Sequence, residues 1–206
     1  MSFNTKQDHI AVVIKEFTLK RKSEGFTDRY SEPYIVSIAI DEKGAASPSI
    51  EFNILPFPKV RKGDRISFDG QGHLIYGPAN PGSFLAYSIL FMESDRDLRE
   101  TGDVVEEIMN SQAVEMGAKS LLLANPGYAA AADVLQKLIS LIAKKLKANK
   151  DDELYRRNGT LLRDVTPPYD ILRTYTSEND YIQLQTAIIP LKESNALGSQ
   201  TKCIEL

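Results

Sequence analysis

The chain has 206 residues, of which 42% are hydrophobic, and its formal net charge at pH 7 is -3. This length suits one large domain, or one domain with an insertion, and the hydrophobic fraction is sufficient for a buried core. The small negative charge gives no general attraction to nucleic acid, so we expect no nucleic-acid partner. A single cysteine, Cys203, excludes a disulfide within the chain and favours a reducing compartment.

Six short segments with the patterns of β-strands fill the first half of the chain. Each segment either alternates apolar and polar residues or is apolar throughout, and turn-forming residues separate them. The segments are Ile10–Lys22, Pro33–Asp41, Ser49–Leu55, Arg65–Phe68, His73–Tyr76 and Phe84–Met92. The last of them is apolar along its length, which predicts a central strand buried on both faces.

The hydrophobic period changes after Asp103. Apolar residues then recur at helical spacing, first up to Met116 and again from Tyr128 to Ala148, where they form one continuous stripe. Asn125-Pro126-Gly127 separates the two stretches and predicts a turn between two helices. We therefore expect a helical hairpin over about residues 103–150, with its apolar stripe buried against a sheet or a partner helix rather than lying on a membrane.

Strand patterns return after the hairpin. Leu154–Arg163 contains Asn158-Gly159, which predicts a tight type I′ turn between two strands. Tyr169–Thr176 and Tyr181–Leu191 are the last predicted strands, and the polar residues 192–206 predict a disordered tail. The fold prediction is a mainly β protein: an antiparallel β-sandwich of eight to nine strands, forming a single domain over residues 1–191, with an α-helical insertion.

An acidic loop follows the predicted central strand. Within eleven residues it contains five carboxylates: Glu93, Asp95, Asp97, Glu100 and Asp103. Crowded carboxylates repel one another, so water or a cation must hold such a loop, and calcium is the natural cation for several oxygen ligands. The alternative is a solvated loop in which Asp103 caps the following helix.

Two segments resemble the C2 domain, a family of β-sandwiches that bind calcium and acidic lipids through loops at one end. Ser31-Glu32-Pro33-Tyr34 is similar to the entry of a C2 strand, and Asp95, Asp97 and Asp103 follow the spacing of the third calcium loop of the family. The resemblance implies a C2-like sandwich. It also implies that Asp95, Asp97 and Asp103 are calcium ligands, with Glu32 as a fourth; Glu93 joins them as a candidate ligand because it lies in the same acidic loop.

The sequence favours a non-enzymatic binding module that engages a protein partner or an anionic membrane surface through these acidic loops, with calcium as the candidate cofactor. No nucleophile elbow, phosphate-binding glycine loop or dinucleotide fingerprint occurs. One alternative is a metal-assisted hydrolase that uses the carboxylates of Glu93, Asp95, Asp97 and Asp103. Another is a structural or assembly protein that oligomerises through the helical insertion. The sequence leaves the oligomeric state open.

The start of the chain lacks the apolar core of a signal peptide, and no stretch approaches the roughly 20 apolar residues that span a bilayer. We therefore expect a cytoplasmic protein.

Overall fold

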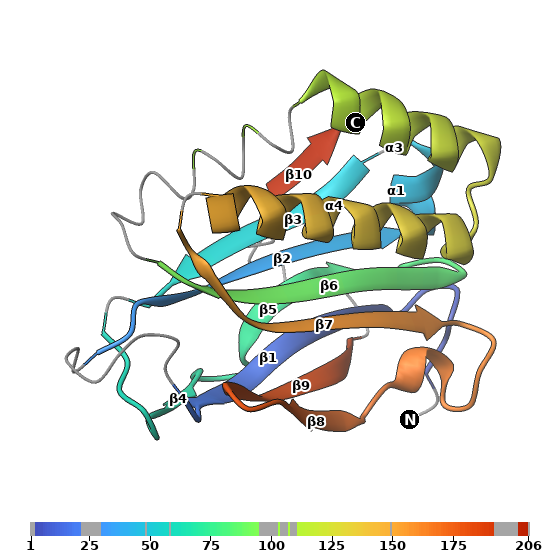
Figure 1. Cartoon of the computed structure of the whole chain (residues 1–206). Coiled ribbons are helices and arrows are strands. Elements are labelled where there is room, and N and C mark those ends of the chain that lie inside the picture. Colours follow the sequence, from blue (N-terminus) through green and yellow to red (C-terminus); the bar gives the residue numbers. More distant parts are fainter. Residues whose placement is uncertain are drawn as a thin grey trace.

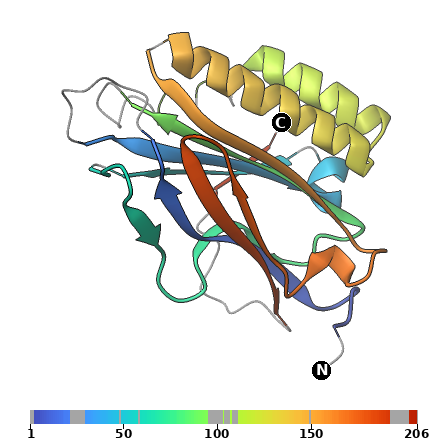
Figure 2. The same ribbon diagram turned by 60° about the horizontal axis from the view of Figure 1, so that its bottom comes forward.

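The computed structural model of the protein describes residues 3–21, 30–47, 49–57, 59–94, 103, 107, 111–148, 150–191 and 202–205. The described part is mainly β, with two antiparallel five-stranded sheets that pack face to face and a layer of helices over one of them. Figure 1 shows this order of layers, and Figure 2 shows the same layers from a view turned by 60°.

The first sheet has the order β4-β1-β9-β8, and β5 also pairs with β1. Both β4 and β5 lie along the same edge of β1, since β5 pairs with its first half and β4 with its second half. The bounds of these strands are β1 (His9–Leu19), β4 (Arg65–Ser67), β5 (His73–Ala79), β8 (Thr174–Glu178) and β9 (Ile182–Leu191).

The second sheet has the order β10-β3-β2-β6-β7. Its strands are β2 (Pro33–Asp41), β3 (Ser49–Pro56), β6 (Phe84–Glu93), β7 (Asp152–Leu162) and β10 (Lys202–Glu205). The two central strands are buried on both faces, as the apolar run of Phe84–Met92 predicts. Along β2, Val36 and Ile38 belong to the cluster beneath the helices, whereas Ile35 belongs to the cluster between the sheets.

The helices are α1 (Glu42–Ala46), α3 (Gln112–Ala124) and α4 (Tyr128–Ala148) in the described part of the chain. The two longer helices lie between β6 and β7 in sequence, where the insertion is predicted. The predicted apolar stripe of α4 is buried against the second sheet: Val134, Leu135, Leu138, Ile139, Ile142 and Leu146. Its lysines, such as Lys137 and Lys144, are exposed on the opposite face. Figure 1 shows both helices above β2, β3 and β6.

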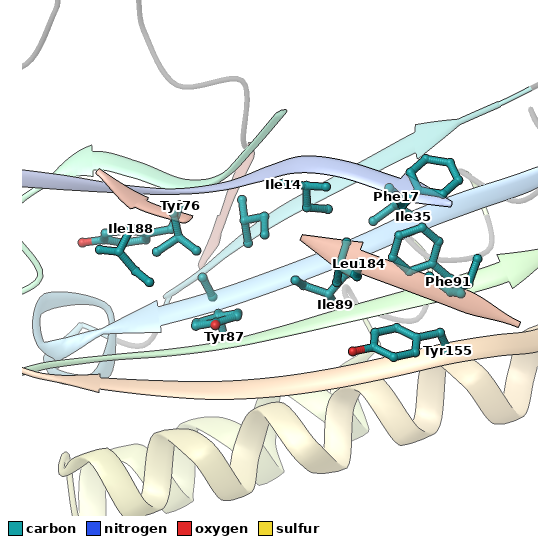
Figure 3. Packing of buried hydrophobic residues seen from close by; sticks show 14 of the residues in the cluster. Ile14, Phe17, Ile35, Tyr76, Tyr87, Ile89, Phe91, Tyr155, Leu184 and Ile188 are labelled. Atoms are coloured by element: carbon teal, nitrogen blue, oxygen red, sulfur yellow. The ribbon is translucent and has the colours of Figure 1, made fainter. Parts of the chain in front are cut away.

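Aromatic and branched side chains fill the space between the two sheets. Figure 3 shows Ile14 and Phe17 from β1 facing Ile35, Ile89 and Phe91 from the second sheet. The rings of Phe17 and Phe91 meet edge to face, with centroids 5.1 Å apart. Burial of such side chains is the main favourable contribution to folding, so this layer holds the two sheets together.

Side-chain hydrogen bonds bridge the sheets along both of their open sides. On one side the Tyr155 hydroxyl of β7 donates to Ser177 of β8 at 2.7 Å, and the Asn179 amide donates to the carbonyl of Leu154 at 2.8 Å. On the other side Asn53 of β3 lies 3.1 Å from Nε2 of His73 in β5. Side-chain hydrogen bonds therefore bridge the sandwich on both sides.

The predicted turn at Asn158-Gly159 is wrong. Strand β7 runs without interruption from Asp152 to Leu162 and pairs along its length with β6. Gly159 lies opposite Tyr87, and a β-carbon on Gly159 would lie only 2.3 Å from the Tyr87 ring. The glycine thus leaves space for the Tyr87 ring in the middle of a strand. The local sequence alone does not distinguish this role from a role in a turn.

Two further segments near the end of the chain differ from their predictions. The predicted strand Tyr169–Thr176 is correct only at its end: a short 3-10 helix, η1 (Pro168–Asp170), occupies its start, and β8 begins at Thr174. The predicted tail contains β10, in which Lys202–Glu205 pair with β3; the rest of residues 192–206 lies outside the described residues. With β10, the described part contains ten strands instead of eight to nine.

None of the helices in the described part combines the length and the apolar character that crossing a membrane requires.

Candidate functional site

A cleft of about 790 Å³ opens at the end of the second sheet where β2 runs into α1. Its volume falls within the range of small-molecule sites, roughly 300–1,000 Å³. Residues from β1, β2, β3, β5, α1 and α3 line it, and its chemically active side chains are those of His9, Asp41, Lys43, Glu51, Tyr76 and Lys119. These positions span more than half of the sequence, so the fold alone brings them together.

Asp41 is the last residue of β2 and anchors the floor of the cleft. Its Oδ1 accepts a hydrogen bond from the backbone N–H of Gly44 at 2.6 Å, which caps α1. Its Oδ2 accepts a hydrogen bond from the Tyr76 hydroxyl at 2.8 Å. The carboxylate is therefore fixed between a helix start and the opposite sheet, and it keeps lone pairs for a further donor, because an ionised carboxylate has about four acceptor positions.

Tyr76 is a fully buried residue of β5 that reaches Asp41 from the first sheet. Burial, together with the negative charges of Asp41 and Glu51, raises the pKa of Tyr76 far above its ordinary value. The hydroxyl therefore stays protonated at every physiological pH and acts as a permanent donor to Asp41. This arrangement holds the carboxylate of Asp41 in place.

Glu51 places a second carboxylate in the cleft. It lies on β3 between Ile50 and Phe52, whose side chains face the helices, so Glu51 faces the first sheet. Its Oε2 lies 3.4 Å from the backbone nitrogen of Gly77, which donates to it. Gly77 has a φ of 81°, and a β-carbon there would lie 2.4 Å from the carbonyl oxygen of Ile10, so only glycine fits at this bulge of β5.

The positive side of the cleft comes from the helices. Lys43 in α1 and Lys119 in α3 both line it, and both side chains are exposed. Neither lysine forms an ion pair with any residue in the part of the chain that the structure describes. The carboxylates thus come from strands and the ammonium groups from helices, so the cleft presents both signs of charge on separate elements.

The structure places Glu32 and Glu93, two of the acidic residues predicted from the sequence, at the opposite end of β2. Glu32 is exposed and directly precedes β2, and its carbonyl oxygen accepts a hydrogen bond from the N–H of Ser94 at 3.2 Å. Glu93 is the last residue of β6, is buried, and lies opposite Pro33 in the sheet. The entry to β2 and the exit from β6 therefore lie side by side.

The other predicted ligands follow β6 in the sequence. Asp103 is exposed and helical, whereas Asp95 and Asp97 lie outside the described residues. Within the described ranges, no three His, Cys, Asp or Glu side chains are grouped closely enough to hold a metal ion. Glu32, Glu93 and Asp103 therefore do not form such a group by themselves, and the calcium site remains a prediction that depends on Asp95 and Asp97.

The cleft was not predicted from the sequence. Asp41 and Glu51 are ordinary polar positions in predicted strands, and nothing local marks Tyr76 as their partner. One feature of the sequence could have indicated it: Asp41 is the single charged residue of the predicted strand Pro33–Asp41 and stands at its end. Three residues later comes Gly44, whose backbone N–H donates a hydrogen bond to Asp41. That pattern indicates a helix cap, but the approach of β5 depends on the packing of the two sheets.

Comparison of the chain with protein-family models, with curated proteins and with solved structures found no significant match.

Proposed function

We propose that the protein is a non-enzymatic binding module whose cleft between the sheets and the helices holds a small polar ligand. The observation that carries this proposal is the cleft of about 790 Å³ in which two carboxylates and two lysines face one space. Groups of this kind fix the orientation of a ligand and select it by charge.

The contacts of the cleft favour binding over catalysis. Gly44 and Tyr76 hold both oxygens of Asp41, and the raised pKa of Tyr76 prevents it from serving as a base near neutral pH. Fixed groups of this kind need no rearrangement when a ligand enters, which reduces the free energy lost on binding. The cleft is thus preorganised for recognition.

A thermal-shift panel tests the proposal. It contains amino acids, dicarboxylates, diamines and hexoses, each at millimolar concentration. A ligand present at one hundred times its Kd adds about 2.7 kcal/mol to stability. For a chain of this size that corresponds to a rise of roughly 5–10 °C in Tm.

The variant Ser47→Tyr places a ring in the cleft and should abolish the rise in Tm. Ser120→Tyr makes the same change on the exposed face of α3, outside the cleft, and should retain it. If no compound on the panel shifts Tm, or if Ser47→Tyr still responds, the protein does not bind small polar ligands in this cleft.

A second candidate function is calcium-dependent binding to a protein partner or an anionic membrane through the acidic residues that follow β6. The hydrogen bond between Ser94 and Glu32 supports it, because it places the start of the acidic stretch beside the fourth implied ligand. The proposed relationship to C2 domains is part of this second candidate function. Calorimetric titration with calcium tests it: heat that disappears in the double variant Asp95→Asn, Asp97→Asn is expected, and a titration without heat removes this function.

A further inference from the structure

We infer that the ligand of the cleft is a small zwitterion of the amino-acid or short-peptide type, with its ammonium group held by Asp41 and Glu51 and its carboxylate held by Lys43 and Lys119. This inference rests on the proposed function and names the class of ligand for the same site.

The charges that line the cleft argue against a ligand of one sign. At pH 7 the carboxylates of Asp41 and Glu51 balance the ammonium groups of Lys43 and Lys119. A simple anion that reaches the lysines meets two carboxylates in the same cleft, and a simple cation meets two ammonium groups. Like charges brought close together in one cleft repel each other. A ligand with one group of each sign satisfies both sets.

The positions of the charges give the ligand an orientation. Asp41 and Glu51 point toward the first sheet, as their contacts with Tyr76 and Gly77 show. Lys43 and Lys119 come from helices that lie on the other side of the second sheet. The ammonium group of the ligand therefore enters between the sheets, and its carboxylate lies at the helical rim.

A neutral sugar fits the lining less well. Sugar sites usually offer the exposed face of an aromatic ring, because one face of the sugar is apolar. Among the residues that line this cleft, Tyr76 is the only aromatic ring besides the imidazole of His9, and it is fully buried with its hydroxyl bound to Asp41. Charged recognition is therefore the stronger feature of the cleft.

The test uses the whole chain and three forms of each probe. Leucine, glutamine and trialanine are titrated by calorimetry as free zwitterions, as N-acetyl derivatives and as C-terminal amides. The N-acetyl forms lack the ammonium group, and the amides lack the carboxylate. At least one free zwitterion should bind at least tenfold more tightly than either of its derivatives.

Two substitutions then assign the ends of the ligand. Glu51→Gln should weaken the free zwitterion at least tenfold while leaving the N-acetyl form unchanged, because that form has no charge for Glu51 to recognise. Lys119→Met should weaken the free zwitterion to a similar extent while leaving the amide unchanged. Glu178→Gln and Lys144→Met make the same changes on exposed faces away from the cleft, and they should bind like the unmodified protein.

Equal affinity for the zwitterion and its derivatives overturns the inference, as does an absence of binding by every form. Putrescine and succinate separate this failure from failure of the proposed function. If either one binds and Ser47→Tyr abolishes that binding, the cleft is a ligand site but its ligand is not a zwitterion.

Discussion

Gly159 lies directly opposite Tyr87 across the β6–β7 pair, and the Tyr87 ring occupies the space that any side chain on Gly159 would need. A β-carbon there would lie 2.3 Å from the ring. We expect Gly159→Ala to lower the free energy of unfolding by about 1–3 kcal/mol, because an overpacked core forces its neighbours to shift. Urea denaturation measures the change.

Gly127→Ala is the matched control, because the nearest atom to its added β-carbon would be 3.6 Å away, an ordinary contact distance. In a Tyr87→Leu background the cost of Gly159→Ala should shrink, because the obstructing ring is gone. An equal cost in both backgrounds would show that the glycine is needed for a reason other than the ring.

The hydrogen bond from Tyr76 to Asp41 should contribute measurably to stability. Tyr76→Phe leaves one oxygen of a half-buried carboxylate without this donor, which typically costs about 1–3 kcal/mol. Tyr128→Phe removes a hydroxyl from a side chain that is 53% exposed and should change stability little. If chemical denaturation gives the same midpoint for both variants, Tyr76 does not stabilise the fold through Asp41.

Glu153 predicts a pH dependence at the junction of α4 and β7. Burial opposes its ionisation, but Lys147 at 2.9 Å and Arg156 at 3.1 Å together lower the pKa of Glu153 below its usual value. Because the folded pKa is depressed, the ion pairs stabilise the fold above the unfolded pKa and lose this effect as the pH falls through the folded pKa.

At pH 7 we expect Glu153→Gln to cost about 0.5–1 kcal/mol, since these side chains are partly exposed and solvent screens them. The difference between variant and unmodified protein should be smaller at about pH 3 than at pH 7, because protonation of Glu153 removes its charge as the pH falls through its folded pKa. Thermal unfolding at the two pH values measures this, with Asp180→Asn as the control, because Asp180 is exposed and forms no ion pair in the described part of the chain. A deficit of equal size at both values would contradict the role of the ion pairs.

His73 predicts a second pH dependence, at the bridge between β3 and β5. Burial lowers its pKa, and Asn53 lies 3.1 Å from its Nε2, where a neutral imidazole accepts a hydrogen bond from the amide. The unfolded chain therefore takes up a proton at a higher pH than the folded one, so stability is present above pH 6.5 and declines as the pH falls toward the folded pKa.

His73→Gln should remove part of the decline in Tm between pH 7 and pH 5. His9→Gln is the control, because His9 is the only other histidine of the chain. If the decline in Tm persists in His73→Gln and disappears in His9→Gln, then His9 rather than His73 causes it, and the prediction is wrong.

Sequence patterns predicted the strands better than the turns. The bounds of β2 match the prediction at both ends, and β6 differs by one residue, because apolar runs between turn residues depend on local sequence alone. The turn predicted at Asn158-Gly159 was wrong because the same dipeptide can form a tight turn or lie within a strand. The Asn158 amide oxygen accepts a hydrogen bond from Ser88 at 2.8 Å, and Gly159 accommodates Tyr87, so partners about 70 residues away decide the outcome.

The candidate site could not be predicted from the sequence, for a related reason. Asp41 and Tyr76 meet only because two sheets pack face to face, and Lys119 reaches the same cleft only because α3 lies beside α1. The acidic residues that the sequence does make conspicuous, such as Glu93 and Asp103, lie together in the chain without forming a ligand group in the described part.

Strand β10 also matters for handling the protein. Lys202–Glu205 pair with Ser49–Phe52 and so cover the outer edge of the first half of β3. A preparation clipped by a protease ahead of residue 202 would leave that edge with unpaired amide and carbonyl groups, which readily join a strand of another molecule. Such material is expected to aggregate on storage. Measuring the mass of the chain to confirm that it is intact is therefore a useful check on sample quality.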